Sequence, residues 1–394
     1  MSKTSRSLSV LSSRVAGTTA LVTAAIGLAP PAEAAFLQTN LVSSIPGLAT
    51  LTDPLLINPW GISRSPTSPF WISNQGTNSS TLYGVTGTTT VSAVTAVNAN
   101  GFVGIPTTAA GPQGPTGQVN NTNTASFQLT PGTTSTSSRF LFADLNGTIS
   151  GWAGGLTSTV VATTPGAVYT GLAINAAGTR LYAADDAGGT INVFDASFAP
   201  VSLPGGFVDP NLPAGFVPFG IQDIGGKVYV TYAAAGLAAQ RGALPGSGLV
   251  SIFDENGAFL QRIVTGSQLA SPWAMALAPA GFGEFGGDLL VGNFSFATSE
   301  INAFDPLTGA FKGSIGIDVG AGNTAGGLWG FEFGSGAGNG GNANTLYFVD
   351  GINGETAGLF GAIAVAPVPE PATLPLIGLG LAAVDWIRRR RKVS

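Results

Sequence analysis

The 394-residue chain contains 58 Gly and 25 Pro, whereas only 9% of its residues are charged. Gly is about twice as frequent as in an average soluble protein and charged residues are about a third as frequent, which excludes a helical bundle and favours an all-β protein rich in turns. The chain contains no Cys and no His. It therefore lacks disulfides and the side chain that proteins use most often as a general base and metal ligand.

The first 35 residues have the parts of a secretory signal peptide, including a site for signal peptidase near their end. Three basic residues precede an apolar run at 15–28, Pro30 and Pro31 would end a helix, and Ala32-Glu33-Ala34 has the small-x-small cleavage pattern. A first transmembrane helix is the alternative, but this run is shorter than the roughly 20 residues that span a bilayer. The sequence predicts export, with a mature chain that starts near residue 35 or 36.

The predicted mature body, residues 36–366, is acidic. It contains seven Lys and Arg residues against seventeen Asp and Glu residues, which gives a formal charge of −10. A body with this charge repels phosphate backbones and anionic lipid surfaces. The composition therefore argues against nucleic acid as a partner.

One short strand pattern recurs six times along this body. Each copy is apolar and ends in a polar residue, and the copies occupy 70–74, 140–144, 181–185, 228–232, 289–293 and 346–350. A second predicted strand follows every copy within about 20 residues. Most copies also follow a strand in which a small residue stands between larger ones, as in Trp60-Gly61-Ile62 and Trp329-Gly330-Phe331.

A period of about 46 to 70 residues with three or four short strands per unit is typical of a β-propeller. The sequence predicts six blades, with the isolated strand at 36–42 completing the last one. For the second blade we expect the innermost strand at 125–129 and a long surface loop at 107–124. A pair of β-sandwiches is the alternative, but that fold would not require six similar units.

The polar residues that end the repeated strands are candidate ligands. They are Asn74, Asp144, Asp185, Tyr232, Asn293 and Asp350. If the blades superpose, these side chains surround one end of the central channel, where carboxylate and amide oxygens suit Ca²⁺. The alternative is that each side chain caps its own turn by accepting hydrogen bonds from backbone N–H groups.

Three tryptophans occupy equivalent positions, just before the small residue of the innermost strand. They are Trp60, Trp273 and Trp329. Aromatic faces can stack on sugar rings, which makes these residues candidates for carbohydrate binding. Packing between adjacent blades is the alternative.

The C-terminal segment 367–394 has three parts in a fixed order. Pro369, Glu370 and Pro371 precede an apolar stretch at 372–387, and a basic end follows that contains Arg388, Arg389, Arg390 and Arg391. An apolar stretch before a basic cluster predicts a short membrane-spanning segment with a cytoplasmic anchor. The order of the three parts resembles the PEP-CTERM sorting signal of Gram-negative bacteria that secrete exopolysaccharide. A tail anchor that is never processed is the alternative.

This resemblance implies that exosortase, an integral-membrane transpeptidase, recognises the Pro-Glu-Pro motif and removes the tail. The protein would be anchored transiently in the inner membrane and then reach the cell surface or the extracellular space. The body resembles exported PEP-CTERM proteins with a propeller body and, more remotely, NHL and strictosidine-synthase-like propellers. Those families imply a binding or structural component linked to exopolysaccharide or biofilm, or alternatively a Ca²⁺-dependent hydrolase or lactonase that acts at the channel rim.

Overall fold

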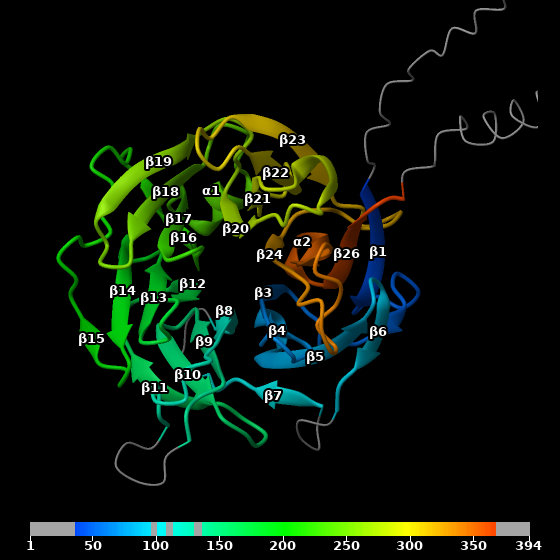
Figure 1. Ribbon diagram of the computed structural model, residues 1–394, viewed down its shortest axis with the longest axis horizontal. Coiled ribbons are helices and arrows are strands. Elements are labelled where there is room, and N and C mark those ends of the chain that lie inside the picture. The colour runs from blue at the N-terminus through cyan, green and yellow to red at the C-terminus, as the bar shows by residue number, and fades with distance from the viewer. Residues whose placement is uncertain (1–35, 96–100, 108–112, 130–135, 368–394) are drawn as a thin grey trace, which may run out of the picture. The chain divides into compact units, whose positions relative to one another are not determined.

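Six mainly antiparallel sheets are arranged radially around a central axis (Figure 1). The computed structural model describes residues 36–95, 101–107, 113–129 and 136–367. The predicted signal peptide lies outside these residues, as does the sorting tail from residue 368 onward. The described body is a six-bladed β-propeller, which confirms the all-β architecture that the repeats predict and excludes the β-sandwich alternative.

The strands of the first three blades follow one another outward from the axis in chain order. Blade one contains β3 (Pro59–Ser63), β4 (Phe70–Asn74), β5 (Ser79–Thr86) and β6 (Thr90–Ala93), with β7 (Phe102–Gly104) paired to β5. Blade two contains β8 (Pro115–Asn120), β9 (Phe140–Asp144), β10 (Thr148–Trp152) and β11 (Thr159–Thr163). Blade three contains β12 (Tyr169–Ile174), β13 (Arg180–Asp185), β14 (Thr190–Asp195) and β15 (Pro200–Val201).

The remaining blades have the same plan. Blade four contains β16 (Phe216–Asp223), β17 (Lys227–Ala234), β18 (Leu249–Asp254) and β19 (Phe259–Thr265). Blade five contains β20 (Pro272–Leu277), β21 (Leu289–Asn293), β22 (Glu300–Phe304) and β23 (Phe311–Gly316). Blade six contains β24 (Leu328–Phe333), β25 (Leu346–Asp350), β26 (Leu359–Val365), β1 (Phe36–Ser43) and β2 (Leu51–Thr52).

Short helical turns lie in the loops between strands. Helix α1 (Leu237–Arg241) follows β17, and helix α2 (Ile352–Glu355) follows β25. The 3₁₀ turns η1 (Gln75–Thr77) and η2 (Gly283–Phe285) precede β5 and β21. In the part of the chain that the structure describes, neither α-helix has the length or the apolar character needed to cross a membrane.

The last blade is built from both ends of the body. Strand β1 pairs antiparallel with β26, from Phe36 opposite Val365 to Ser43 opposite Leu359. This pairing supplies the hydrogen bonds that an exposed edge of β26 would otherwise lack. The ring is therefore closed by the N-terminal strand, as predicted for residues 36–42.

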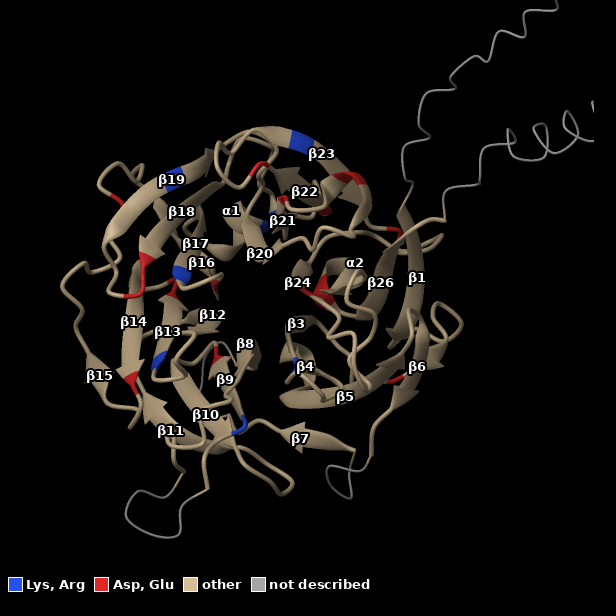
Figure 2. Ribbon diagram, in the orientation of Figure 1, with Lys and Arg blue, Asp and Glu red and all other residues tan. Residues whose placement is uncertain are grey.

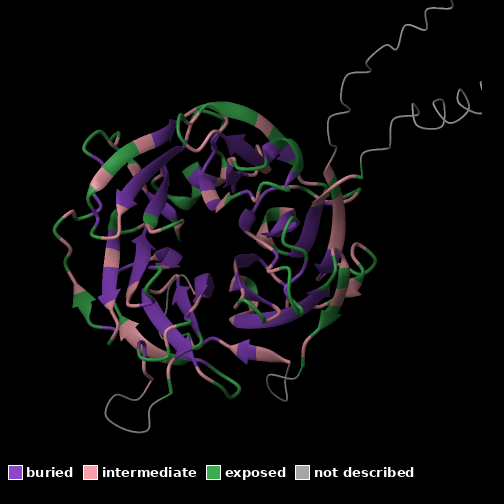
Figure 3. Cartoon of the chain, viewed as in Figure 1, coloured by how far each residue is buried: buried purple, intermediate pink, exposed green. Residues whose placement is uncertain are grey.

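The six repeated strands occur where the sequence predicts them. Strands β4, β9, β21 and β25 have the predicted bounds, and β13 and β17 extend them by one to three residues. Every residue of β4, β9, β21 and β25 is buried, because each blade packs between two neighbours (Figure 3). Burial on both faces of a sheet favours near-continuous apolar runs over alternating ones.

The prediction for the second blade is wrong. Its innermost strand is β8 (Pro115–Asn120), which lies inside the predicted loop, and residues 125–129 form a turn with an isolated bridge from Gln128 to Ser137. Strand β8 has a polar sequence whose buried side chains are paired across blades. The Thr116 hydroxyl donates to the Tyr169 carbonyl over 2.8 Å, and Gln118 Oε1 accepts from the Ser73 hydroxyl over 3.0 Å. These pairings, which the sequence does not reveal, allow a polar segment to be a core strand.

Candidate functional site

A layer of aromatic side chains lies in the central channel. The innermost strands place a residue at one equivalent position, and in four blades this residue is Trp60, Phe219, Trp273 or Trp329. The ring of Trp60 stacks on Trp329 with centroids 3.4 Å apart, and Phe294 stacks on Trp329 with centroids 4.0 Å apart. Trp273 meets Trp329 edge-on at 6.0 Å. Side chains from blades one, four, five and six therefore meet near the axis.

Hydrogen bonds fix this layer. The Trp329 Nε1–H donates to Asn58 Oδ1 over 2.9 Å. The Trp273 Nε1–H donates to the Thr170 carbonyl over 2.8 Å, which links blade five to blade three. Among the described residues Trp60 Nε1 is buried and has no hydrogen-bond partner. A buried donor of this kind is costly unless another molecule satisfies it.

Two cavities lie at opposite ends of the innermost strands and share no lining residue. We call the cavity at the beginning of these strands the front cavity and the one at their ends the rear cavity. Consecutive parts of one strand line different cavities: Trp60 lines the front cavity, whereas Gly61 and Ile62 line the rear one. The aromatic layer therefore lies between them.

The front cavity has a volume of about 390 Å³, within the usual range of small-molecule sites. Its apolar lining comes from side chains of blades one to four: Trp60, Leu145, Val168, Phe219 and Leu237. Its polar lining consists of amides, one hydroxyl and three charged groups: Asn58, Gln75, Gln113, Gln240, Thr170, Asp186, Arg241 and Glu355. The wall thus combines an aromatic surface with many hydrogen-bonding groups.

A polar network organises one side of the front cavity. Asn58 Nδ2 donates to Gln75 Oε1 over 2.8 Å and to Glu355 Oε1 over 3.4 Å. Glu355 Oε2 accepts from an Arg241 guanidinium N–H, which joins α1 of blade four to α2 of blade six. Asn58 has a φ of 45°, in the left-handed region that few residues other than Gly adopt. This backbone strain is retained where its side chain connects the cavity wall to Trp329.

Another polar contact lies in the wall of the front cavity. Gln240 Nε2 donates to Asp186 Oδ1 over 2.6 Å and so connects blade four with blade three. Burial raises the pKa of Asp186, although the hydrogen bond from Gln240 opposes this effect. The hydrogen bond from Gln240 therefore stabilises the charged form of the carboxylate.

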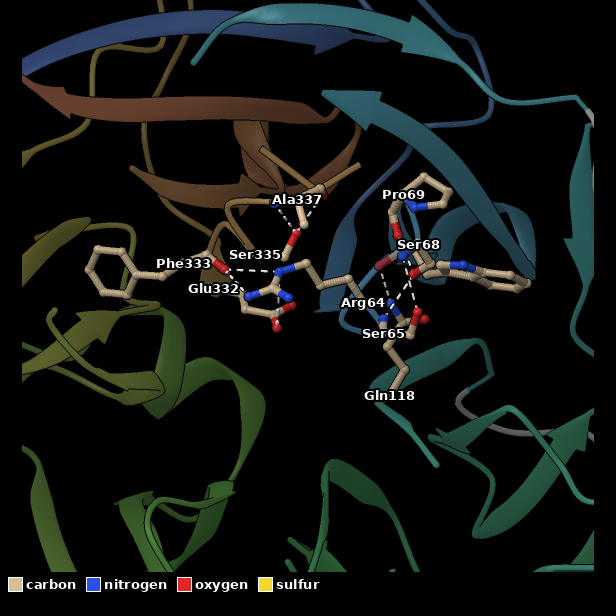
Figure 4. Close-up of polar contacts among 10 residues, drawn as sticks. Arg64, Ser65, Ser68, Pro69, Gln118, Glu332, Phe333, Ser335 and Ala337 are labelled. Atoms are coloured by element: carbon tan, nitrogen blue, oxygen red, sulfur yellow. Dashed lines mark hydrogen bonds and ion pairs between the residues drawn. The ribbon is translucent and has the colours of Figure 1, made fainter. Parts of the chain in front are cut away.

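The rear cavity has a volume of about 320 Å³ and contains an ion pair between adjacent blades (Figure 4). Arg64 donates from Nε and Nη2 to the Phe333 carbonyl over 3.0 and 2.7 Å, and its Nε lies 3.6 Å from Glu332 Oε1. The side chain of Glu332 is 31% exposed, because it faces the channel. Removal of bulk water by the channel walls raises its pKa to about 7, while Arg64 lowers it.

The predicted ligands at the strand ends are buried and do not line the front cavity. Asp144 accepts from Gly114 N–H over 3.2 Å, and Asp185 accepts from the N–H groups of Val168 and Gly188 over 3.0 Å each. Asn293 Oδ1 accepts from Ala270 N–H over 2.9 Å. These contacts connect the strand end to backbone at the start of the same blade or to its own turn.

The other strand-end residues have different surroundings. Asn74 Nδ2 donates to the hydroxyls of Ser79 and Thr81 over 3.1 and 3.0 Å. Asp350 Oδ2 accepts from Ser299 over 3.4 Å, and its Oδ1 has no partner among the described residues. Burial raises the pKa of Asp350 to about 7, whereas the pKa of Asp144 rises to about 6.

In the described ranges no group of three or more Asp and Glu residues is arranged to hold a metal ion. Calcium binding by the strand-end residues stays a prediction.

Three residues that line the front cavity come directly after predicted strand-end ligands. Gln75, Leu145 and Asp186 come directly after Asn74, Asp144 and Asp185. Side chains alternate between the two faces of a strand, so the buried residue that ends the strand is followed by one that can face the channel. The pair Asp185-Asp186 was the signal in the sequence that could have identified this position.

The predicted carbohydrate-binding tryptophans differ in exposure. Trp60 is 4% exposed and lines the front cavity, and the partly exposed Trp273 lines the rear cavity. Trp329 is fully buried, with Trp60 and Phe294 stacked on it. The three side chains belong to one layer, but they do not form one surface.

Two uncharacterized proteins of Acanthamoeba polyphaga mimivirus are similar to this chain. R648 is 33% identical over 67% of this chain and 66% of its own length, and L690 is 30% identical over 70% of this chain and 72% of its own length. The chain belongs to their family. Both relatives are described only as uncharacterized, so membership in this family does not indicate an activity.

A sorting motif and a solved structure complete the comparisons. Residues 367–392 match the family model of the PEP-CTERM protein-sorting motif, which marks an exported protein sorted by an exosortase-type system. The structure of a streptogramin B lyase is similar with a TM-score of 0.50 and 12% identity, over 84% of this chain and 98% of that one. At this identity the likeness supports the propeller fold alone.

Proposed function

We propose that this protein is an exported binding propeller that holds a neutral saccharide unit in its front cavity. It would act as a component of the cell surface or extracellular matrix. The observation that carries the proposal is the wall of the front cavity, in which Trp60 and Phe219 lie beside four amide side chains and the Arg241–Glu355 pair. A pyranose ring offers an apolar face to aromatic residues and hydroxyl groups to the polar ones.

The charges of the front cavity favour a neutral ligand. Arg241 is paired with Glu355, so Asp186 supplies the remaining formal charge. An acidic sugar would meet this carboxylate and a body with a formal charge of −10. A neutral ligand avoids this repulsion, and its hydroxyl groups can donate to the carboxylates and accept from the amides.

The three tryptophans have separate roles in this proposal. Trp60 contacts the ligand through its ring, which lines the front cavity. Trp329 supports Trp60 from behind, since Trp60 and Phe294 stack on it. Trp273 is oriented by Thr170 and faces the opposite end of the channel.

The sorting motif supports a location in a polysaccharide-rich matrix. We propose residues 1–35 as the signal peptide, 36–366 as the propeller and 367–394 as the sorting tail. Signal peptidase and exosortase would process the two ends, and the mature body would reach the cell surface or medium of a Gram-negative bacterium. A saccharide site would then let the propeller associate with exopolysaccharide in a biofilm.

Binding should be tested with the folded body on an array of neutral and acidic glycans, followed by calorimetric titration of the glycans that bind. We expect neutral glycans to bind, and Gln75→Ala and Trp60→Phe each to weaken binding at least tenfold. Gln261→Ala, a change at an exposed amide of β19, is the matched control and should bind as the wild type does. The absence of glycan binding, or unchanged binding in both cavity variants, would refute the proposal.

Calcium-dependent hydrolysis at the channel rim is the second candidate function. One observation favours it: Asp350 Oδ1 is buried and has no partner among the described residues. If Asp350 and Asp144 hold Ca²⁺, the cation should raise the melting temperature of the wild type, and Asp350→Asn should abolish that shift. If they cap turns instead, Ca²⁺ should leave both melting temperatures unchanged.

A further inference from the structure

The rear cavity repeats the chemistry of the front cavity at the other end of the channel. Each cavity is lined by one tryptophan, Trp60 in front and Trp273 behind. Each also contains one Arg–Glu pair that joins two blades, Arg241 with Glu355 in front and Arg64 with Glu332 behind. The two cavities share no lining residue, but they are lined by the same types of side chain.

The rear cavity also has amides and apolar walls. Gln118, Asn120 and Gln222 contribute polar groups, and Leu172 and Ile221 are among the apolar ones. Gln118 and Asn120 are held by contacts with Trp71 and Arg139, whereas Gln222 is exposed at the cavity edge. The volume of about 320 Å³ lies within the range of small-molecule sites.

The ion pair of the rear cavity suits a neutral ligand that carries hydroxyl groups. The Arg64 guanidinium is directed at the Phe333 carbonyl by two hydrogen bonds and lies beside the Glu332 carboxylate (Figure 4). A cation would be opposed by Arg64 and an anion by Glu332. A hydroxyl group can donate to the carboxylate and accept from the guanidinium, and such charge-assisted hydrogen bonds are stronger than neutral ones.

We infer that the rear cavity is a second saccharide site, so that one propeller can bridge two glycan chains. This inference rests on the proposed function of the front cavity. The two sites open at opposite ends of the innermost strands and are separated by the aromatic layer. One short glycan cannot occupy both, which makes the protein a bivalent cross-linker.

Two matched variants can close the sites one at a time. Gln222→Trp adds bulk at an exposed position of the rear cavity, and Leu237→Trp adds it at a position of the front cavity that is 48% exposed. Both positions lie at the surface, so neither change alters the core. The melting temperature of each variant should therefore stay close to that of the wild type.

The experiment is calorimetric titration of the full body with cellohexaose, maltohexaose and chitohexaose. We expect two binding sites in the wild type, one in each single variant and none in the double variant. Glu332→Gln should weaken only the site that remains in Leu237→Trp, by about tenfold. Only the wild type should increase the particle size of a dilute solution of the matching polysaccharide in light scattering.

Each contrary result has a distinct meaning. A single site in the wild type that disappears in Leu237→Trp and persists in Gln222→Trp would overturn the second site and leave the proposed function intact. A single site that disappears in Gln222→Trp would assign binding to the rear cavity alone and overturn both bivalency and the front-cavity proposal. No binding of any of the three probes would overturn both proposals.

Discussion

At the scale of single residues, Asp350 is the strand-end residue whose charged form is the least favourable in the folded protein. It is fully buried, its pKa is raised to about 7, and one of its oxygens has no partner among the described residues. The equivalent positions of blades one and five hold Asn74 and Asn293, so an amide fits at this point of a blade. A charge at this position destabilises the fold.

We predict that Asp350→Asn stabilises the protein above pH 7. The folded-state pKa is above 3.8, the ordinary value of an Asp side chain, so the folded protein binds this proton more tightly than the unfolded chain does. The tighter binding of this proton adds to the free energy of unfolding. The addition is complete below about pH 4 and is lost as pH rises to about 7. The gain at pH 8 should be at most about 4 kcal/mol, from the size of the pKa shift. Urea unfolding at pH 4 and pH 8 measures it.

Asp195→Asn is the control, because its effect on stability at pH 8 should be opposite to that of Asp350→Asn. Hydrogen bonds from Ser197, first through its hydroxyl, lower the pKa of Asp195, which ends β14 at the protein surface. Its stabilising effect is present at neutral pH and is lost as pH falls through the lowered pKa. The Asn variant should therefore be slightly less stable than the wild type at pH 8. A loss of stability at pH 8 in Asp350→Asn would contradict our account of that residue.

At the scale of strands, the innermost strands determine how closely the blades approach one another. A Cβ atom added to Gly220 of β16 would overlap the Trp273 carbonyl of the next blade, and one added to Gly61 of β3 would overlap the Thr116 carbonyl. Blade five has Ala274 at this position and is the exception. The small residues thus allow the aromatic layer to form from neighbouring strands.

We predict that Gly220→Ala destabilises the protein by about 1–3 kcal/mol, the usual cost of overpacking a core. The added methyl group must displace the backbone of β20, which also moves Trp273. Gly316→Ala in β23 is the control, because its added Cβ would have no atom within 4 Å. Thermal unfolding should show a lower melting temperature only for Gly220→Ala. Equal effects of the two changes would disprove close blade contact as the cause.

The sequence was informative for strands and less so for the site. Apolar runs between two blades identify β4, β9, β21 and β25 to the residue, because burial on both faces leaves little alternative. Strand β8 was missed since its buried Thr116 and Gln118 are paired with residues of other blades. The lining of the front cavity was not predicted, because it depends on side-chain direction and on helices α1 and α2, which the repeat pattern does not specify.

At the scale of the whole molecule, the propeller is a ring of six blades whose few charged residues are scattered around it (Figure 2). Strand β1 closes the ring, so the N-terminal end of the body is fixed in blade six beside β26. The described chain reaches residue 367, where the sorting motif begins. Both ends of the described body therefore lie in the last blade.

We predict that Glu370→Ala keeps the protein in the membrane fraction of a bacterium that has an exosortase. The largely apolar stretch at 372–387 and the arginines after it favour retention, since moving that basic cluster across the bilayer is costly. Release then requires cleavage of the chain, and loss of the central carboxylate of the Pro-Glu-Pro motif should prevent this cleavage.

Fractionation measures retention in the membrane, and intact-mass analysis shows whether the tail is still attached. Glu284→Ala, at an exposed carboxylate of the propeller, should be released as the wild type is. Release of Glu370→Ala at the wild-type mass would show that the motif does not direct processing.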